Sequence, residues 1–327
     1  MIRKPLSVLA AAALTLLAAC SSGSPSGTTT SSGAASGGGG GKEVNVAVIP
    51  IVDCAPAFLG VSKGFFAEEG LNVKITQVTG GAAAVSGVVG GSFDIGFGNP
   101  VSTMVAVDKG LALRYVSNGV TTSGKRPDFG AVVVKADSAI KTPADLAGKT
   151  VSVNNLSNIG DTTIRKIVED AGGDPKTIKF VEVPFPDAPA ALDRGQIDAA
   201  WLLEPFLSAS VAAGSRIVTN NFIDFDPNLD IAGYFTKTEN FDAKKDLVAA
   251  FQRGMKKSLD YANTHEQEVR DIVGTYTKIS AADRAKMVMP RYLPDFHRDA
   301  VQKMADAMLK YGTVTKAVNV SAILPPS

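Results

Sequence analysis

Short apolar runs alternate with helix-like segments along two stretches of the chain, and the two stretches match. In the first, strands are predicted at 44–49, 72–78 and within 91–100, with helices at 57–69 and 82–90. In the second, strands are predicted at 150–154, 178–183 and within 195–205, with helices at 161–171 and 188–195. Strands that alternate with helices of this length predict two α/β lobes with parallel sheets.

The clearest repeat is the segment that ends each stretch. Gly91-Ser-Phe-Asp-Ile-Gly-Phe-Gly-Asn-Pro100 and Gly195-Gln-Ile-Asp-Ala-Ala-Trp-Leu-Leu-Glu-Pro205 share glycine, aspartate and aromatic positions, and each ends at proline. Asp94 therefore corresponds to Asp198, at an offset of 104 residues. A short apolar run between turn residues is typical of a strand buried on both faces, and proline cannot continue a central strand.

The remaining pattern connects these two units. A helix at 101–109, a strand at 111–116, a loop at 117–126 and a strand at 130–134 lead into the second unit, where Thr142 is the expected N-cap of a helix. A return strand at 231–235 precedes helices at 244–265, 266–276, 281–289 and 298–311, which we expect to pack on the first lobe. The first lobe is thus predicted to contain 43–130 and 233–327, and the second 131–232.

The N-terminus has the features of a targeting segment. Arg3 and Lys4 precede an apolar run at 6–19 that is too short to span a bilayer. The run ends in Leu17-Ala-Ala-Cys20, which resembles the bacterial lipobox. This predicts a signal peptide at 1–19 and lipidation of Cys20, with an ordinary secretory peptide as the alternative. A tether at 20–42, rich in serine and glycine, would follow and hold the folded part at the outer face of the membrane.

Composition narrows the function classes. The 327 residues suffice for about two domains, and the net charge of +1 gives no reason to expect a nucleic-acid partner. Neither His265 nor His297 has a metal-ligand partner at suitable spacing, and the phosphate-binding and nucleophile motifs are missing. No catalytic residue, metal or cofactor is therefore predicted. Cys54 is the only cysteine besides Cys20, and we expect it to be a small buried or half-buried residue rather than a reactive thiol.

Two lobes joined by crossovers should form a cleft between facing strand ends, and polar or aromatic residues near those ends are ligand candidates. These candidates are Asp53, Phe58, Asn99, Thr121, Asn154, Ser157, Asn158, Asp161, Trp201 and Glu204. For several of them a structural role is equally open. Residues 154–161 could offer free N–H groups or simply cap a helix, Trp201 could be core, and Glu204 could accept hydrogen bonds from a loop.

Several motifs in the same order resemble one known family. They are Gly64-Phe-Phe-Ala-Glu-Glu-Gly-Leu-Asn-Val73, Gly91-Ser-Phe-Asp94, Asp145-Leu-Ala-Gly-Lys-Thr-Val151 and Gly195-Gln-Ile-Asp-Ala199 with Glu204-Pro205. The sequence is similar to the solute-binding proteins of ABC importers for nitrate, sulfonate, taurine and thiamine-pyrimidine precursors. That resemblance implies a type II periplasmic-binding-protein fold, with a cleft that delivers a small solute to a membrane permease. The protein would act as a monomer.

The nature of the ligand stays open between two classes. Asp53, Asp161 and Glu204 favour a neutral solute with N–H donors, such as a pyrimidine, over a sulfonate, taurine or nitrate. One branch of the family resembles a yeast-type pyrimidine synthase, but its active-site histidine and cysteine-rich segment are missing here. Two alternatives to the importer component remain: an extracytoplasmic enzyme on the same scaffold, and a structural surface lipoprotein without a ligand.

Overall fold

The computed structural model describes residues 41–325. The predicted signal peptide at 1–19, the lipidated Cys20 and most of the tether lie outside the described residues. β1 begins at Lys42, which the sequence had assigned to the tether. Within 41–325, none of the helices combines the length and the apolarity that a membrane span requires.

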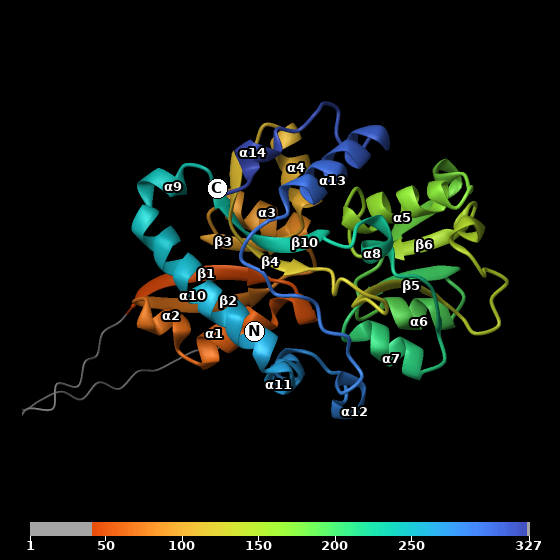
Figure 1. Cartoon of the computed structure of the whole chain (residues 1–327), viewed down its shortest axis with the longest axis horizontal. Coiled ribbons are helices and arrows are strands. Elements are labelled where there is room, and N and C mark those ends of the chain that lie inside the picture. Colours follow the sequence, from red (N-terminus) through yellow and green to blue (C-terminus); the bar gives the residue numbers. More distant parts are fainter. Residues whose placement is uncertain (1–40, 326–327) are drawn as a thin grey trace, which may run out of the picture. The chain divides into compact units, whose positions relative to one another are not determined.

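Two five-stranded sheets form the framework of the described chain (Figure 1). The first sheet has the order β2 (Leu71–Gln77), β1 (Lys42–Val48), β3 (Ile95–Gly98), β10 (Asp230–Lys237) and β4 (Leu113–Thr121). The second has the order β7 (Lys179–Glu182), β6 (Thr150–Val153), β8 (Ala199–Leu203), β5 (Gly130–Val134) and β9 (Arg216–Thr219). The two orders are equivalent, so the predicted α/β fold with two similar lobes is confirmed.

Each sheet is mixed, although the sequence predicted parallel sheets. β10 runs antiparallel to β3 and β4, and β5 runs antiparallel to β8 and β9. Each of these strands enters its sheet after the chain has crossed from the other lobe, so it arrives from the opposite end. The crossovers are the segments 122–129 and 220–229, and the predicted lobe boundaries at 130/131 and 232/233 fall inside β5 and β10.

Helices cover the faces of both sheets (Figure 1). The first lobe carries α1 (Ala55–Ser62), α2 (Phe65–Glu68), α3 (Gly81–Val89) and α4 (Pro100–Asp108), preceded by the 3-10 turn η1 (Val52–Cys54). The second carries α5 (Ile159–Asp170), α6 (Ala188–Asp193), α7 (Phe206–Ala212) and α8 (Asn221–Phe225), with the turns η2 (Pro143–Leu146) and η3 (Pro175–Thr177). Every residue of β3 and β8 is buried, as predicted for the two matching strands covered on both faces.

The C-terminal part is helical, as the sequence predicted. It contains α9 (Asn240–Ala243), α10 (Lys245–Thr264), α11 (Glu266–Tyr276), α12 (Ala281–Arg284), α13 (Arg298–Lys310) and α14 (Val320–Ile323). α10 packs on α1 and α2 of the first lobe, whereas α12 also contacts α7 and α13 also contacts α5 of the second lobe. The tail therefore touches both lobes, which the sequence had not predicted.

Three predicted elements differ in extent from those observed. The single helix expected at 57–69 is broken into α1 and α2, because Gly64 adopts a left-handed conformation with φ of +80°. The expected loop at 117–126 begins as strand, since β4 continues to Thr121 by pairing with β10. The helix expected at 281–289 ends at Arg284. Gly70 and Gly172 have positive φ at their helix ends, as predicted.

The matched aspartates have the same structural role in both lobes. Asp94 Oδ2 accepts a hydrogen bond from Asn45 N at 3.0 Å, and Asp198 Oδ2 accepts one from Thr150 N at 2.7 Å. Each aspartate also donates its own N–H to the carbonyl of the same strand residue, at 2.9 Å. The pair thus fixes the middle of β1 against the start of β3 and the start of β6 against the start of β8, which explains why both copies have aspartate.

We expect Asp94→Ala and Asp198→Ala each to lower the free energy of unfolding by about 1 kcal/mol, because each removes a charged acceptor from a strand N–H. The two losses should add in the double variant, since the sites lie in separate lobes. Urea unfolding measures all three variants. The exposed Asp137, between β5 and η2, provides the control: Asp137→Ala should change stability by less than ~0.5 kcal/mol. Losses no larger than the control's would contradict the assigned role.

Candidate functional site

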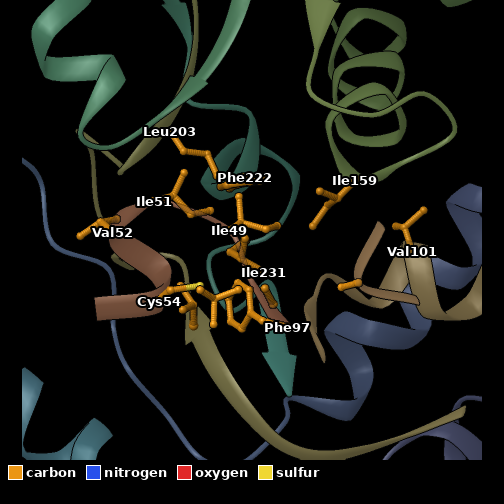
Figure 2. Packing of buried hydrophobic residues seen from close by; sticks show 14 of the residues in the cluster. Ile49, Ile51, Val52, Cys54, Phe97, Val101, Ile159, Leu203, Phe222 and Ile231 are labelled. Carbon is orange, nitrogen blue, oxygen red and sulfur yellow. The ribbon is translucent and has the colours of Figure 1, made fainter. Parts of the chain in front are cut away.

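A cavity lies where the carboxyl ends of strands from both sheets meet. Its lining consists of Ile49, Ile51, Asp53, Phe97, Asn99, Asn154, Ile159, Phe185, Trp201, Leu203, Phe222, Ile231 and Ala232. Among these lining residues, Figure 2 labels Ile49, Ile51, Phe97, Ile159, Leu203, Phe222 and Ile231. Ile49 and Ile51 lie near Leu203 and Phe222 in that view. The cavity volume is about 20 Å³, which is room for about one water molecule.

Equivalent positions of the two lobes line this cavity. Phe97 of β3 corresponds to Trp201 of β8 at the offset set by the two aspartates, and both are lining residues. Asn99 and Leu203 form a second such pair. Residues at equivalent positions of the duplicated strands thus line the same cavity. Open α/β sheets bind ligands in this place, at the carboxyl ends of their strands.

Asp53 is the one acidic group in the lining. It sits in η1, and its side chain is 1% exposed. Within the described chain, neither carboxylate oxygen has a hydrogen-bond partner. Burial, together with the negative charge of Asp128, raises the pKa of Asp53 to about 7. A buried carboxyl group without a protein partner favours a ligand that donates hydrogen bonds to it.

Trp201 is both a core residue and a candidate ligand contact. Its ring packs edge-on against Phe185 and Phe222, at centroid distances of 5.3 and 5.6 Å. The indole Nε1 is buried and has no acceptor among residues 41–325. Trp201 therefore offers the cavity a hydrogen-bond donor, while Asp53 offers it an acceptor.

Asn99 and Asn158 join the lobes beside the cavity. Asn99 Nδ2 donates to Asn158 Oδ1 at 2.5 Å, and Asn158 Nδ2 donates to Ser102 Oγ at 2.9 Å. Both are also helix N-caps: Asn99 accepts from Ser102 N at the start of α4, and Asn158 accepts from Ile159 N at the start of α5. The two helix starts face each other. Asn99 and Asn158 therefore each cap a helix and also form a contact between the lobes.

The polar turn before α5 is committed to capping. Asp161 Oδ1 accepts from Asn158 N at 2.6 Å and Oδ2 from Ser157 N at 2.9 Å, which completes a capping box. Ser157 adopts a positive φ of 52° to allow this geometry and is exposed. Burial raises the pKa of Asp161 despite these bonds. Of the candidate residues at 154–161, only Asn154 lines the cavity.

Glu204 fastens the second lobe to the C-terminal part of the chain. Its side chain is 1% exposed and accepts from Ser208 N at 3.0 Å, Ser208 Oγ at 2.7 Å and Val288 N at 3.1 Å. Its backbone carbonyl accepts from Val52 N at 3.0 Å. Burial raises the pKa of Glu204 to about 7. The residue is absent from the cavity lining, so the loop-bonding alternative describes its position.

Two further candidates lie away from the cavity. Thr121 Oγ1 donates to Asp230 Oδ1 at 2.7 Å, where β4 ends and β10 begins. Phe58 stacks on Tyr276 of α11, with ring centroids 4.1 Å apart. Thr121 therefore belongs to the crossover and Phe58 to the contact between α1 and α11. Cys54 is buried, which raises the pKa of its thiol well above the ordinary value, as expected for an unreactive residue.

Sequence reasoning missed three aromatic lining residues. Phe97 could have been found, because it occupies the repeat position of Trp201. Phe185 follows β7 between two prolines and could have been found by the strand-end argument used for Asn99. Phe222 enters from α8, a helix that the sequence pattern did not predict. In the described range, no cluster of three or more His, Cys, Asp or Glu side chains is arranged to hold a metal ion.

Glu204 makes stability depend on pH in a defined direction. Its folded pKa of about 7 lies above the ordinary 4.5, so its stabilising contribution is complete below pH ~4.5 and is lost as pH rises through 7. Between about pH 5.5 and pH 8, Glu204 should remove ~2 kcal/mol of unfolding free energy. In urea unfolding, Glu204→Gln should reduce this loss of stability between about pH 5.5 and pH 8. Some loss should remain, because the pKa of Asp53 is also raised to about 7. The exposed Glu239→Gln is the control, and an unchanged drop in Glu204→Gln would refute the assignment.

Comparison with known proteins places the chain in a family. The profile described as "NMT1/THI5 like" matches residues 52–269, which is two thirds of the chain. The formylaminopyrimidine-binding protein of Halalkalibacterium halodurans is 23% identical over 223 residues. That match covers 67% of this chain and 65% of the relative, so just under two thirds of the relative's length is spanned. The taurine-binding periplasmic protein of Escherichia coli is 27% identical over 214 residues, covering 64% of each chain.

Solved structures show the same fold at low identity. The alkanesulfonate-binding protein SsuA from Xanthomonas axonopodis pv. citri, bound to MOPS, superposes with a TM-score of 0.74 at 17% identity. The alignment covers 87% of this chain and 98% of SsuA. The nitrate-binding protein NrtA from Synechocystis PCC 6803 gives a TM-score of 0.72 at 14% identity, over 86% and 84% of the two chains. The fold is that of periplasmic binding proteins, and the chain belongs to the NMT1/THI5-like family.

Proposed function

We propose that this protein is the extracytoplasmic solute-binding component of an ABC importer. It captures a small solute in the cleft between its lobes and delivers it to a membrane permease. The observation that carries the proposal is the cavity at the meeting strand ends, where the Asp53 carboxylate and the Trp201 indole N–H are buried without protein partners. Groups of this kind, presented by both lobes, suit reversible capture of a polar molecule.

The chemistry of the lining selects among the solutes that relatives bind. Named relatives include binding proteins for formylaminopyrimidine, taurine and alkanesulfonates. No arginine or lysine side chain is part of the lining, whereas Asp53 is. A sulfonate or nitrate would meet a carboxylate without a compensating cation. A pyrimidine with an amino group donates to Asp53 through that group and accepts from Trp201 through a ring nitrogen, and its flat ring suits the aromatic walls.

Movement of the lobes would admit the solute. The cavity is smaller than any of these solutes, and the lobes touch through Asn99 and Asn158 on one side and through Glu204 and Val288 on another. The crossovers at 122–129 and 220–229 are the connections about which the lobes could separate. Neither binding nor release in this scheme requires a chemical step, so the proposed role is not enzymatic.

A direct test is calorimetric titration with a 4-aminopyrimidine, its analogue without the amino group, and taurine, hexanesulfonate and nitrate. We expect the 4-aminopyrimidine to bind, and the analogue to bind at least tenfold more weakly because Asp53 is left unpaired. Asp53→Asn should weaken binding of the 4-aminopyrimidine by roughly 10- to 100-fold. Asp137→Asn, a change of the same type at an exposed site, should leave the affinity within about twofold.

The alternatives give different results in the same titration. Binding of sulfonates but not pyrimidines would reverse the choice of solute while keeping the transport role. Conversion of the pyrimidine during the titration, seen by mass spectrometry, would establish an enzyme instead. A protein that binds none of the five compounds, with an unchanged melting temperature, would support the structural lipoprotein.

We also propose that Cys20 carries the lipid that anchors the protein. The support is the sequence Leu17-Ala-Ala-Cys20 after a short apolar run and before a tether rich in serine and glycine. Such a tether lets the binding part reach a permease in the same membrane.

Cys20→Ser should move the protein from the membrane fraction to the soluble extracytoplasmic fraction, because one acyl-bearing residue supplies the anchor. Fractionation and immunoblotting of a bacterial host that processes lipoproteins measure this. Cys54→Ser is the matched control and should leave the protein in the membrane fraction, because Cys54 is buried in the folded part. Membrane retention of Cys20→Ser would exclude lipidation as the anchor.

A further inference from the structure

Two larger hollows continue outward from the cavity between the same lobes. The nearer one, the throat, has a volume of about 230 Å³ and is lined by Ile49, Pro50, Ile51, Gln77, Val78, Thr79, Pro184, Phe185, Pro186 and Phe206. The outer one, the vestibule, has a volume of about 530 Å³ and is lined by Pro50, Gln77, Pro186, Pro189, Asp193, Phe206, Ala209, Ser210, Ala213, Ser215, Tyr276, Thr277, Lys278 and Ile279.

The three spaces adjoin one another, and together they are called the path. The cavity and the throat share Ile49, Ile51 and Phe185 as walls. The throat and the vestibule share Pro50, Gln77, Pro186 and Phe206. One side of the path comes from the ends of β1 and β2, and the other from the segment after β7 and from α7, so both lobes contribute throughout.

The walls of the path are largely apolar. Phe185 and Phe206 are buried, and prolines face them from both lobes. Tyr276 is held from two sides: its ring stacks on Phe58, and its hydroxyl donates to Ile51 O at 3.0 Å. Among the lining residues of the vestibule only Asp193 and Lys278 carry charge, and the throat lining contains no charged residue.

We propose that the throat and vestibule are a second subsite that takes an apolar substituent of the solute, so that the natural ligand is amphipathic. This rests on the proposed function and names the solute class more closely. A polar head would pair with Asp53 and Trp201 in the cavity, and an alkyl or aryl substituent would lie along Phe206, Pro186 and Tyr276.

Size and polarity both support this division. Ligand pockets in proteins are commonly ~300–1,000 Å³, which the vestibule reaches and the 20 Å³ cavity does not. Apolar substituents gain most where they leave water for apolar walls. A solute that consists only of a polar head would leave the apolar path unfilled.

The test compares 4-aminopyrimidines that carry a formamidomethyl group or its butanamide and hexanamide homologues. In wild-type protein we expect affinity to rise by roughly two- to fourfold for each added methylene group. Ala209→Phe places a ring in the vestibule, so the ratio of hexanamide to formamide affinity should fall towards one. Ala212→Phe makes the same change on the exposed side of α7 and should keep the wild-type ratio.

A second probe keeps this test independent of the pyrimidine head. N-phenyl-1-naphthylamine, a neutral apolar dye, should fluoresce with wild-type protein and with Ala212→Phe but much less with Ala209→Phe. If no pyrimidine binds while this dye pattern holds, the solute class proposed above is wrong and the apolar subsite stands. Affinities that are flat or decrease with chain length, or dye binding that is equal in all three proteins, would overturn the second subsite.

Discussion

Polar groups buried between the lobes need hydrogen-bond partners, and this requirement organises the whole interface. An unpaired buried group costs about 1–3 kcal/mol, which is large beside the total stability of a domain. Asn158 meets the requirement through Asn99, Ser102 and Ile159, and Glu204 meets it through Ser208 and Val288. Asp53 does not meet it within the described chain. Trp201 Nε1 is also unpaired at the cavity, where a solute can satisfy both groups. Within residues 41–325, Asn155 Oδ1 is a further unpaired group, close to Gly80 and outside the cavity lining.

Much of the fold could be predicted because the chain repeats itself. Asp94 and Asp198 stand at matching positions, and the structure gives them the same bond to the first strand of each repeated unit. A repeat in sequence therefore predicted a repeat in strand order. It also predicted part of the cavity lining: residues at strand ends, such as Asn99 and Asn154, line the cavity because equivalent strands end at one shared space.

The other candidates show what sequence could not resolve. Glu204 ends its strand as Asn99 does, yet its carboxylate is engaged by Val288, which lies more than eighty residues further along the chain. Asp161 lies in a turn typical of ligand binding, yet Asn158 and Ser157 take up both of its oxygens. Whether a carboxylate is free depends on tertiary neighbours. Local pattern identifies the strand end or helix start but not the group that reaches it.

The contacts that close the lobes are individually weak, which suits a cleft that must reopen. Direct bonds such as those of Asn158 and Val288 contribute about 0.5–1.5 kcal/mol each, or somewhat more with a charged acceptor. Asn155 also packs closely against Gly80: a Cβ atom at position 80 would lie 2.0 Å from Asn155 Oδ1. This contact contributes complementary shape but no hydrogen bond. A ligand shifts the equilibrium between open and closed lobes only by what it gains in one form over the other. Because Asp53 and Trp201 belong to different lobes, a solute that bonds to both gains more from the closed form. The apolar path, by contrast, can hold a substituent before closure is complete. Hydrogen bonds from the solute to Asp53 and Trp201 would then drive closure of the lobes. Contact of its substituent with the apolar path would decide which solute is bound when the lobes close.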